Sequence, residues 1–194
     1  MNKAQKAAIW DAVHRERLAL AGDLRGLEQV HWDTASLCDG WSVHDLLAHL
    51  IDAAKTTRLG FAWRLAQARF DFDADNEVGV RRERRDAPQD SLAEWRRVAY
   101  FTATPPAPLS SRLVEAFVHG EDIRRPLGFE GDYPIEYVVT ALKLQLATSV
   151  KMGGGKEIAR GRRLVATDAD LDVGEGPRVR GRSIDLLMLV SGRS

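Results

Sequence analysis

Apolar residues recur at helical spacing over most of the chain, and this pattern predicts a mainly α-helical protein. The first pattern runs from about Lys3 to Leu27, and the second runs from Ser42 to about Phe70. Ser91 and Glu94 suggest a capping box at the start of another helix. A further helix covers about residues 134–150. These segments predict a bundle of antiparallel helices.

Two parts of the chain depart from this pattern. Between Asp71 and Asp90 lies a charged segment of weak periodicity, which is either a mobile connection or a short helix over the mouth of the bundle. In the tail, R-R-L-V-A-T-D-A-D and P-R-V-R-G-R read as two short strands joined by the turn D-V-G-E-G. The apolar run S-I-D-L-L-M-L-V predicts a closing helix. We therefore expect a helical domain over residues 1–155 and a short α+β extension, packed on that domain, over residues 156–194.

Composition narrows the classes of partner. The 194 residues include 28 basic and 28 acidic side chains, so no net charge attracts nucleic acid or an anionic membrane. The single cysteine, Cys38, excludes an intramolecular disulfide and is interpreted as a bystander in a turn. The longest apolar run, L-L-M-L-V, is too short to span a bilayer. A cytoplasmic protein, either a monomer or a homodimer, that acts on a small molecule is the resulting expectation.

Candidate metal ligands lie in two helical contexts. Glu115 and His119 are four residues apart, so their side chains lie one above the other on a helix and can approach one ion. A neighbouring helix can supply His49, and three protein ligands leave a position open to water or substrate, as in catalytic zinc sites. The helical wheel places Glu115, His119 and Asp122 on the side opposite the apolar stripe. That polar side either faces water or lines a cavity.

The local chemistry around these residues is consistent with rigid placement. Ser42 and Asp45 form a capping-box pair, so His49 lies about two turns inside a firmly started helix, with Trp41 packing as an anchor at its entrance. Pro126 and Gly128 end the helix that carries Glu115 and His119. Asp122 either accepts a hydrogen bond from an imidazole ligand or is an exposed carboxylate paired with a following arginine. His14, His31 and His44 are either extra ligands or surface residues, and a surface position is the expectation for each.

Three segments resemble one family. The run L-C-D-G-W-S-V-H-D-L-L-A-H-L ends one residue after His49, V-H-G-E-D-I-R-R-P-L-G begins one residue before His119, and the tail contains L-V-A-T-D-A-D-L-D-V-G-E-G-P. In this order they resemble the DinB-like superfamily, and most closely its mycothiol-dependent maleylpyruvate isomerase branch. The resemblance implies an up-and-down four-helix bundle with a small α+β C-terminal extension. It also implies that His49, Glu115 and His119 bind a divalent metal, usually zinc.

The resemblance further implies a function. Members of the branch use the metal to bind and deprotonate a low-molecular-weight thiol such as mycothiol, which suits S-transfer or isomerisation of a small electrophilic substrate. The alternative is a non-catalytic metal- or ligand-binding module of the same fold. An anionic substrate can be contacted by arginines of the basic run, Arg81 and Arg82 among them, and by Arg193 near the end of the chain. The competing interpretation of these arginines is a solvated surface.

Overall fold

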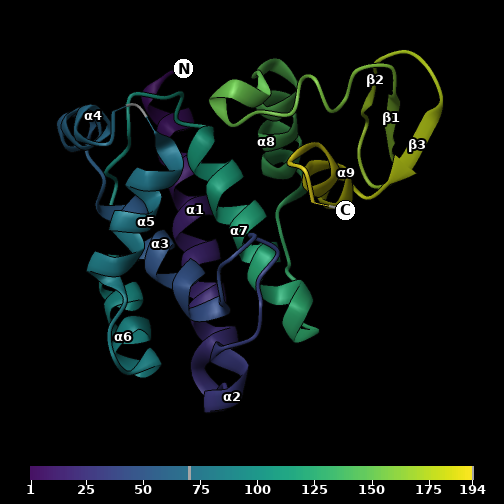
Figure 1. Cartoon of the computed structure of the whole chain (residues 1–194). Helices are drawn as coiled ribbons and strands as arrows, with labels where there is room; N and C mark the ends of the chain where they lie inside the picture. The colour runs from purple at the N-terminus through teal and green to yellow at the C-terminus, as the bar shows by residue number, and fades with distance from the viewer. Residues whose placement is uncertain (70, 194) are drawn as a thin grey trace. The chain divides into compact units, whose positions relative to one another are not determined.

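The elements of the computed structural model follow one another as mostly short helices with a small sheet near the C-terminus (Figure 1). The structure describes residues 1–69 and 71–193. In chain order the elements are α1 (Lys3–Asp23), η1 (Leu24–Gly26), α2 (Gln29–Trp32), α3 (Val43–Lys55), α4 (Arg58–Gln67), α5 (Phe72–Glu83), α6 (Pro88–Val98), α7 (Ser111–Leu127), α8 (Ile135–Ala147), η2 (Val150–Met152), β1 (Arg163–Ala166), β2 (Asp172–Val173), β3 (Arg178–Gly181) and α9 (Ser183–Val190). The predicted mainly α class with a small C-terminal α+β part is confirmed.

These elements divide into two compact units. Unit 1 contains residues 1–13, 109–121 and 131–194, and unit 2 contains residues 14–108 and 122–130. Helices α1 and α7 each contribute residues to both units. The two units are made of segments that are not consecutive in the chain, so they do not test a boundary at one position. The predicted domain boundary at residue 155 stays a prediction.

The sheet of unit 1 has the order β2-β1-β3. Strand β1 pairs antiparallel with β2, Leu164 lying opposite Val173, and parallel with β3, Leu164 lying opposite Val179. The sequence predicted β1 and β3 but not the two-residue β2. Helix α9 begins directly after β3, where Asp168 Oδ1 accepts hydrogen bonds of 2.8 Å from both the backbone N–H and the hydroxyl of Ser183. The side chain of a residue between β1 and β2 therefore accepts hydrogen bonds at the start of the closing helix.

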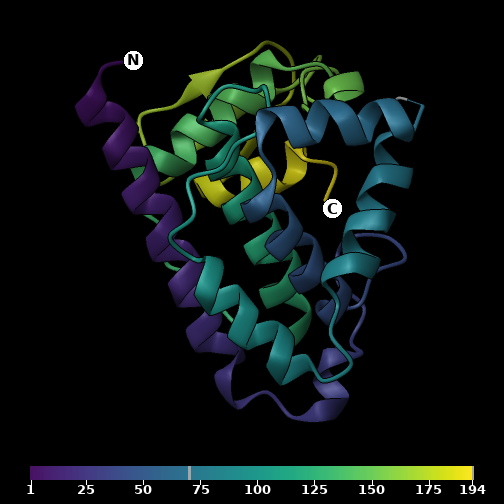
Figure 2. The same ribbon diagram turned by 90° about the vertical axis from the view of Figure 1, so that its left-hand side faces the viewer.

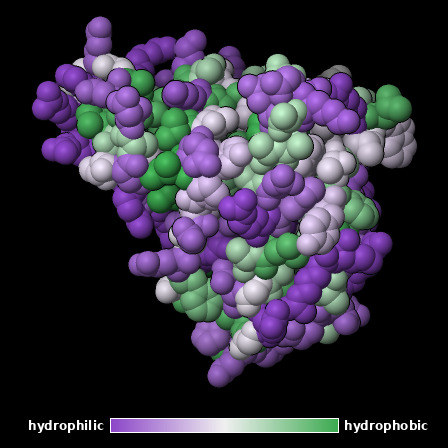
Figure 3. Space-filling model, turned by 180° about the vertical axis from the view of Figure 1, so that it is seen from behind, coloured by the Kyte–Doolittle hydropathy of each residue, from purple (hydrophilic) through white to green (hydrophobic). Residues whose placement is uncertain are grey.

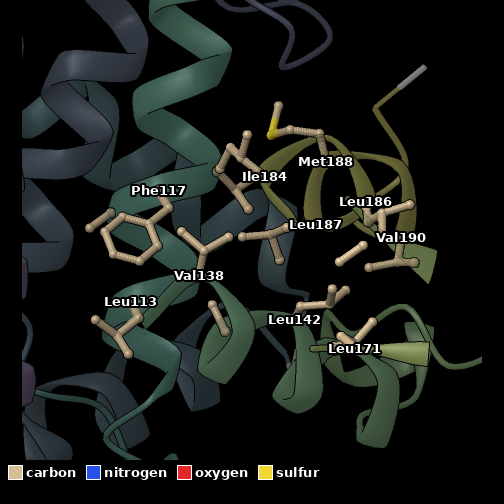
Figure 4. Close-up of a cluster of buried hydrophobic side chains, with 14 of the residues drawn as sticks. Leu113, Phe117, Val138, Leu142, Leu171, Ile184, Leu186, Leu187, Met188 and Val190 are labelled. Atoms are coloured by element: carbon tan, nitrogen blue, oxygen red, sulfur yellow. The ribbon is translucent and has the colours of Figure 1, made fainter. Parts of the chain in front are cut away.

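The core of unit 1 joins the C-terminal helix to the first turns of α7 and to α8. Figure 4 shows Leu113 and Phe117 from α7, Val138 from α8, and Ile184 and Leu187 from α9 meeting in one cluster. Each of these five side chains is at least nine-tenths buried. The apolar face of α9 is therefore part of a packed core and not a solvated tail.

The core of unit 2 is built around α3. Ser42 and Asp45 form the predicted capping box: Ser42 Oγ accepts from the Asp45 N–H at 3.2 Å, and Asp45 Oδ2 accepts from the Ser42 N–H at 3.1 Å. Leu46, Leu47 and Ile51 of α3 are fully buried and belong to one cluster with residues of α1, α6 and α7. Figure 2 shows α4 running across the view and α5 turning down from its end.

The second predicted helix is in fact two helices. α3 ends at Lys55, Thr56 is extended, and Thr57 caps α4 by accepting from the Gly60 N–H at 3.1 Å. Two successive threonines disfavour helix continuation because they are β-branched and their hydroxyls compete for backbone groups. The predicted end of this helix at Phe70 lies outside the described residues. In the charged stretch that follows, the short-helix alternative is correct, since Asp71 caps α5 by accepting from the N–H groups of residues 73 and 74.

The predicted capping box at Ser91 and Glu94 is wrong. α6 begins at Pro88, whose fixed φ suits the first helical position and whose missing N–H costs nothing there. Ser91 lies inside the helix and is fully buried, with its Oγ accepting from the Arg85 N–H at 3.1 Å. Glu94 instead forms ion pairs with Lys55 and an arginine of the next turn.

The surface is mixed in polarity. On the face shown in Figure 3, hydrophilic and hydrophobic residues are interspersed. Within the described residues, every helix is too short or too polar to cross a membrane.

Candidate functional site

His49 belongs to unit 2 and lies in the second turn of α3. Its ring packs against the Trp41 ring at a centroid distance of 5.0 Å, with the planes tilted by 40°. The Trp41 indole N–H donates to Glu77 Oε1 of α5 at 3.4 Å, so the aromatic side chain is held at two points. The capping box below and Trp41 beside it restrict the orientation of His49, as a ligand position requires.

Glu115 and His119 belong to unit 1 and lie one turn apart on α7. Both side chains are partly buried. Arg112 Nη2 lies 2.8 Å from Glu115 Oε2, and these two side chains are only 7% and 15% exposed. The guanidinium thus restrains the Glu115 carboxylate by a charge-assisted contact.

Asp122 follows on the same helix and belongs to unit 2. It is fully buried, and its Oδ2 accepts a hydrogen bond from Cys38 Sγ at 3.2 Å. Its carbonyl oxygen accepts from the Leu37 N–H at 3.1 Å. The alternative that Asp122 is an exposed carboxylate paired with Arg124 or Arg125 is wrong in its exposure, because the side chain is fully buried. Arg124 lies instead against Glu16 and Asp23 of α1.

Cys38 has a contact that the sequence did not indicate. It was interpreted as a bystander, yet its thiol meets a buried carboxylate 84 positions further along the chain. Nothing in the local sequence links these two residues, since Cys38 lies in the turn before α3 and Asp122 lies on α7. The turn that precedes α3 thus packs against the last turns of α7 within unit 2.

The basic run around α5 is largely engaged in ion pairs of unit 2. Arg82 pairs with Asp52 of α3, which also accepts from Arg64 of α4 at 2.8 Å. Arg64 extends to Asp75 at 3.0 Å, and both aspartates are only 4% exposed. Arg81, in contrast, makes an exposed pair of 3.3 Å with Glu77.

Asp45 has a second partner in this run. Arg84 Nε lies 2.7 Å from its Oδ1. Burial works against the charged form, but hydrogen bonds from Ser42 and the charge of Arg84 outweigh it and lower the pKa of Asp45. The carboxylate that starts α3 therefore stays charged.

The remaining candidates are distributed over both units. Arg193 lies in unit 1, where its Nη1 donates to the Ser191 carbonyl at 2.7 Å. His31 is exposed, as expected, whereas His14 is partly buried beside Tyr100. His44 is 1% exposed, which corrects the prediction of a surface position.

His44 is a structural residue of the unit 2 core. Its Nε2 lies 2.8 Å from Ser91 Oγ, and its ring meets Trp32 edge-on at 5.8 Å. Burial, followed by the charge of Arg84, lowers the pKa of His44 below its usual value. The neutral ring is thereby favoured.

The donor set of His49, Glu115 and His119 fits a zinc-type ion by its chemistry. Two imidazoles and one carboxylate are the ligands found in catalytic zinc sites, and three protein ligands leave one position open. Within its own unit, Glu115 is restrained by Arg112 and His49 by Trp41.

Comparison with known proteins identifies relatives of the chain. It is similar to a crystal structure of a histidine-to-alanine mutant of the mycothiol-dependent maleylpyruvate isomerase, with a TM-score of 0.67, 16% identity, and coverage of 97% of this chain and 90% of that one. It is also similar to a crystal structure of the mycothiol-dependent maleylpyruvate isomerase, with a TM-score of 0.62, 17% identity and the same coverage. No curated protein matches the chain.

The structural likeness confirms the predicted fold. The model of the Mycothiol maleylpyruvate isomerase N-terminal domain matches residues 13–124, which is more than half of the chain and includes all three ligand candidates. The resemblance drawn from the sequence motifs is thus confirmed, and the chain belongs to the mycothiol maleylpyruvate isomerase N-terminal domain family.

Proposed function

We propose that the protein is a metal-dependent enzyme that uses a low-molecular-weight thiol of the mycothiol type. The thiol would serve S-transfer to, or isomerisation of, a small electrophilic substrate. The observation that carries this proposal is the match of residues 13–124 to the family, within which lie two imidazoles and a carboxylate on rigid helices.

His49, Glu115 and His119 would hold the ion in this proposal. When bound, a divalent metal such as zinc favours the thiolate form of a thiol at neutral pH. Arg112 orients the Glu115 carboxylate through its 2.8 Å ion pair, and Trp41 restrains the His49 ring. Asp122 is placed three residues beyond His119 on α7, as an acceptor that could fix the orientation of a ligand.

Substrate contacts by arginine are a further part of the proposal. Arg81 is the most available, because its side chain is 66% exposed and its pair with Glu77 is weak. Arg82 would first have to leave the buried Asp52, and Arg193 would have to leave the Ser191 carbonyl. We expect Arg81→Gln to raise KM for an anionic substrate more than Arg82→Gln does.

Metal content tests the ligand set directly. Protein purified without a His-tag should hold about one divalent ion per chain by elemental analysis, and His49→Ala and His119→Ala should each lose most of it. His31→Ala, which alters an exposed histidine of α2, is the matched control and should keep the ion. Chelation should lower the melting temperature, since a metal at 100 times its Kd stabilises the fold by roughly 2.7 kcal/mol. Full metal content in both ligand variants would contradict the assignment.

Thiol binding is tested by spectroscopy. Protein reconstituted with Co²⁺ should develop a sulfur-to-metal charge-transfer band when mycothiol is added. A panel of electrophiles should then show which class consumes the thiol. An unchanged spectrum together with no thiol consumption would favour the non-catalytic module.

The second candidate function, a non-catalytic module, is favoured by one observation. Cys38 supplies a thiol within the contact distance of Asp122 on the helix that carries His119, and a cysteine ligand is typical of closed, structural zinc sites. Cys38→Ser separates the two functions. An enzyme with an open position keeps its ion and its thiol chemistry in this variant, whereas a structural site closed by the cysteine loses the ion.

A further inference from the structure

Unit 1 contains a cavity of about 330 Å³ that none of the metal-ligand candidates lines. It lies where the end of α8, the segment between η2 and β1, and the residues after β2 come together. Its volume is at the lower end of the range of small-molecule sites. Its apolar lining includes Leu146 of α8, Leu164 of β1 and Val173 of β2.

One wall of this cavity is held by a contact that only glycine permits. Gly174 has φ +87°, and a Cβ at this position would lie 2.3 Å from the Arg162 carbonyl oxygen. The backbone before β1 and the backbone after β2 are therefore in direct contact. Arg162 and Glu175, which flank this contact in the lining, are consequently attached to a rigid part of the unit.

The charged lining is predominantly positive. Lys156, Arg160 and Arg162 contribute three cations, and Glu175 contributes the single carboxylate found among the described lining residues. In the part of the chain that the structure describes, none of these three cations forms a side-chain hydrogen bond or an ion pair. The neighbouring Arg163, in contrast, makes two bonds of 2.7 and 2.6 Å to Asp172. All three cations are exposed, and only Arg160 acts on a nearby carboxylate of the described residues, that of Glu157, so their charges are open to an anion from solution.

We propose that this cavity binds a small organic anion. Its apolar body would lie on Leu146, Leu164 and Val173, and its carboxylate or phosphate group would be bound by Lys156, Arg160 and Arg162. An apolar surface with a few convergent polar groups is the usual composition of a small-molecule site. A guanidinium binds either anionic group through paired N–H donors. This site goes beyond the proposed thiol chemistry and does not depend on it.

Titration of the full-length protein with three probes tests the site. Benzoate and phenyl phosphate carry the anion on an apolar ring, and benzamide is the neutral control of similar shape. In amide nuclear magnetic resonance spectra, both anions should shift the signals of residues 159–162 and 173–175 in a saturable manner. Benzamide should bind more weakly, and added salt should weaken the anions because exposed charges are screened.

Three variants make the test specific. Arg162→Ala should weaken benzoate binding about threefold, as expected for loss of one exposed charge partner. Glu175→Gln should strengthen it by about the same factor, since the repelling carboxylate is removed. Lys143→Ala removes an exposed lysine of α8 outside the lining and should change nothing. Equal binding of benzamide, equal effects of Arg162→Ala and Lys143→Ala, or no saturation below about 10 mM would overturn the proposal.

Discussion

Arg124 provides the sharpest test of how unit 2 is stabilised. Its side chain is 1% exposed, its Nη1 lies 2.5 Å from Glu16 Oε1, and its Nε lies 2.7 Å from Asp23 Oδ2. The contacts join the last turns of α7 to α1. We expect Arg124→Met to be strongly destabilising, because it removes one member of a buried ion pair.

The magnitude follows from the burial of each partner. Removing one member of a buried ion pair costs about 3–5 kcal/mol. For a chain of this size, each kcal/mol lowers the melting temperature by about 2–4 °C, so the expected loss is roughly 6–20 °C. Asp23 is 35% exposed, so solvent screens its pair, and Asp23→Asn should cost less than about 1 kcal/mol.

Thermal unfolding followed by far-UV circular dichroism measures these differences. Arg81→Met is the matched control, since it removes an exposed arginine from an ion pair in the same unit and should change stability by less than about 1 kcal/mol. The double variant Glu16→Gln with Arg124→Met should recover part of the loss, because it removes both charges of the buried pair and not one of them. The reasoning is refuted if Arg124→Met melts at the same temperature as Arg81→Met.

Three further outcomes are expected. Because folding lowers the pKa of His44 from its ordinary value of 6.5, the unfolded state binds more protons than the folded state as the pH falls through that value. Stability should therefore fall from about pH 7 to about pH 5. The variant His44→Gln should flatten this fall, which the melting temperature measures. Gly79→Ala should lower the free energy of unfolding by about 1–3 kcal/mol, because its Cβ would lie 2.7 Å from Asp52 Oδ2. Gly22→Ala is the control, since Gly22 has open space around it and its substitution should not destabilise the protein. Urea titrations measure both variants. Deleting residues 162–194 should give an aggregation-prone protein, since buried apolar side chains of α9 are worth roughly 1.5–3 kcal/mol each; a monomeric product that melts at the original temperature would contradict this.

The elements that the sequence predicted well are those whose signals lie within one turn of the chain. The Ser42 and Asp45 pair and the apolar run of residues 183–190 each specify a local structure, and both are present. The break between α3 and α4 was missed, because the apolar pattern continues through it and only the two threonines, Thr56 and Thr57, mark it in the sequence. The start of α6 was misplaced because Pro88 determines it, while Ser91 is used in a contact with His44 from a distant helix.

The candidate site was predicted by motif and not by periodicity. The spacing of Glu115 and His119 is common on solvated helices, and only the family resemblance connected them with His49. The supporting contacts could not be predicted in the same way. Arg112 is identifiable from its spacing to Glu115, but the bond between Cys38 and Asp122 depends on the packing of segments 84 residues apart.

The charged stretch after α4 shows why composition alone misjudges a role. Its residues read as solvated, yet Asp75 is 4% exposed and pairs with Arg64, which also binds the equally buried Asp52. None of the described residues of α4 is fully buried, and Leu59 and Trp63 are 85% and 65% exposed. Apolar burial therefore contributes little to holding α4 in place. The ion pairs of Arg64 with Asp52 of α3 and Asp75 of α5 are the contacts that link α4 to its neighbours, and removing one member of a buried pair is costly because the other charge stays in the interior.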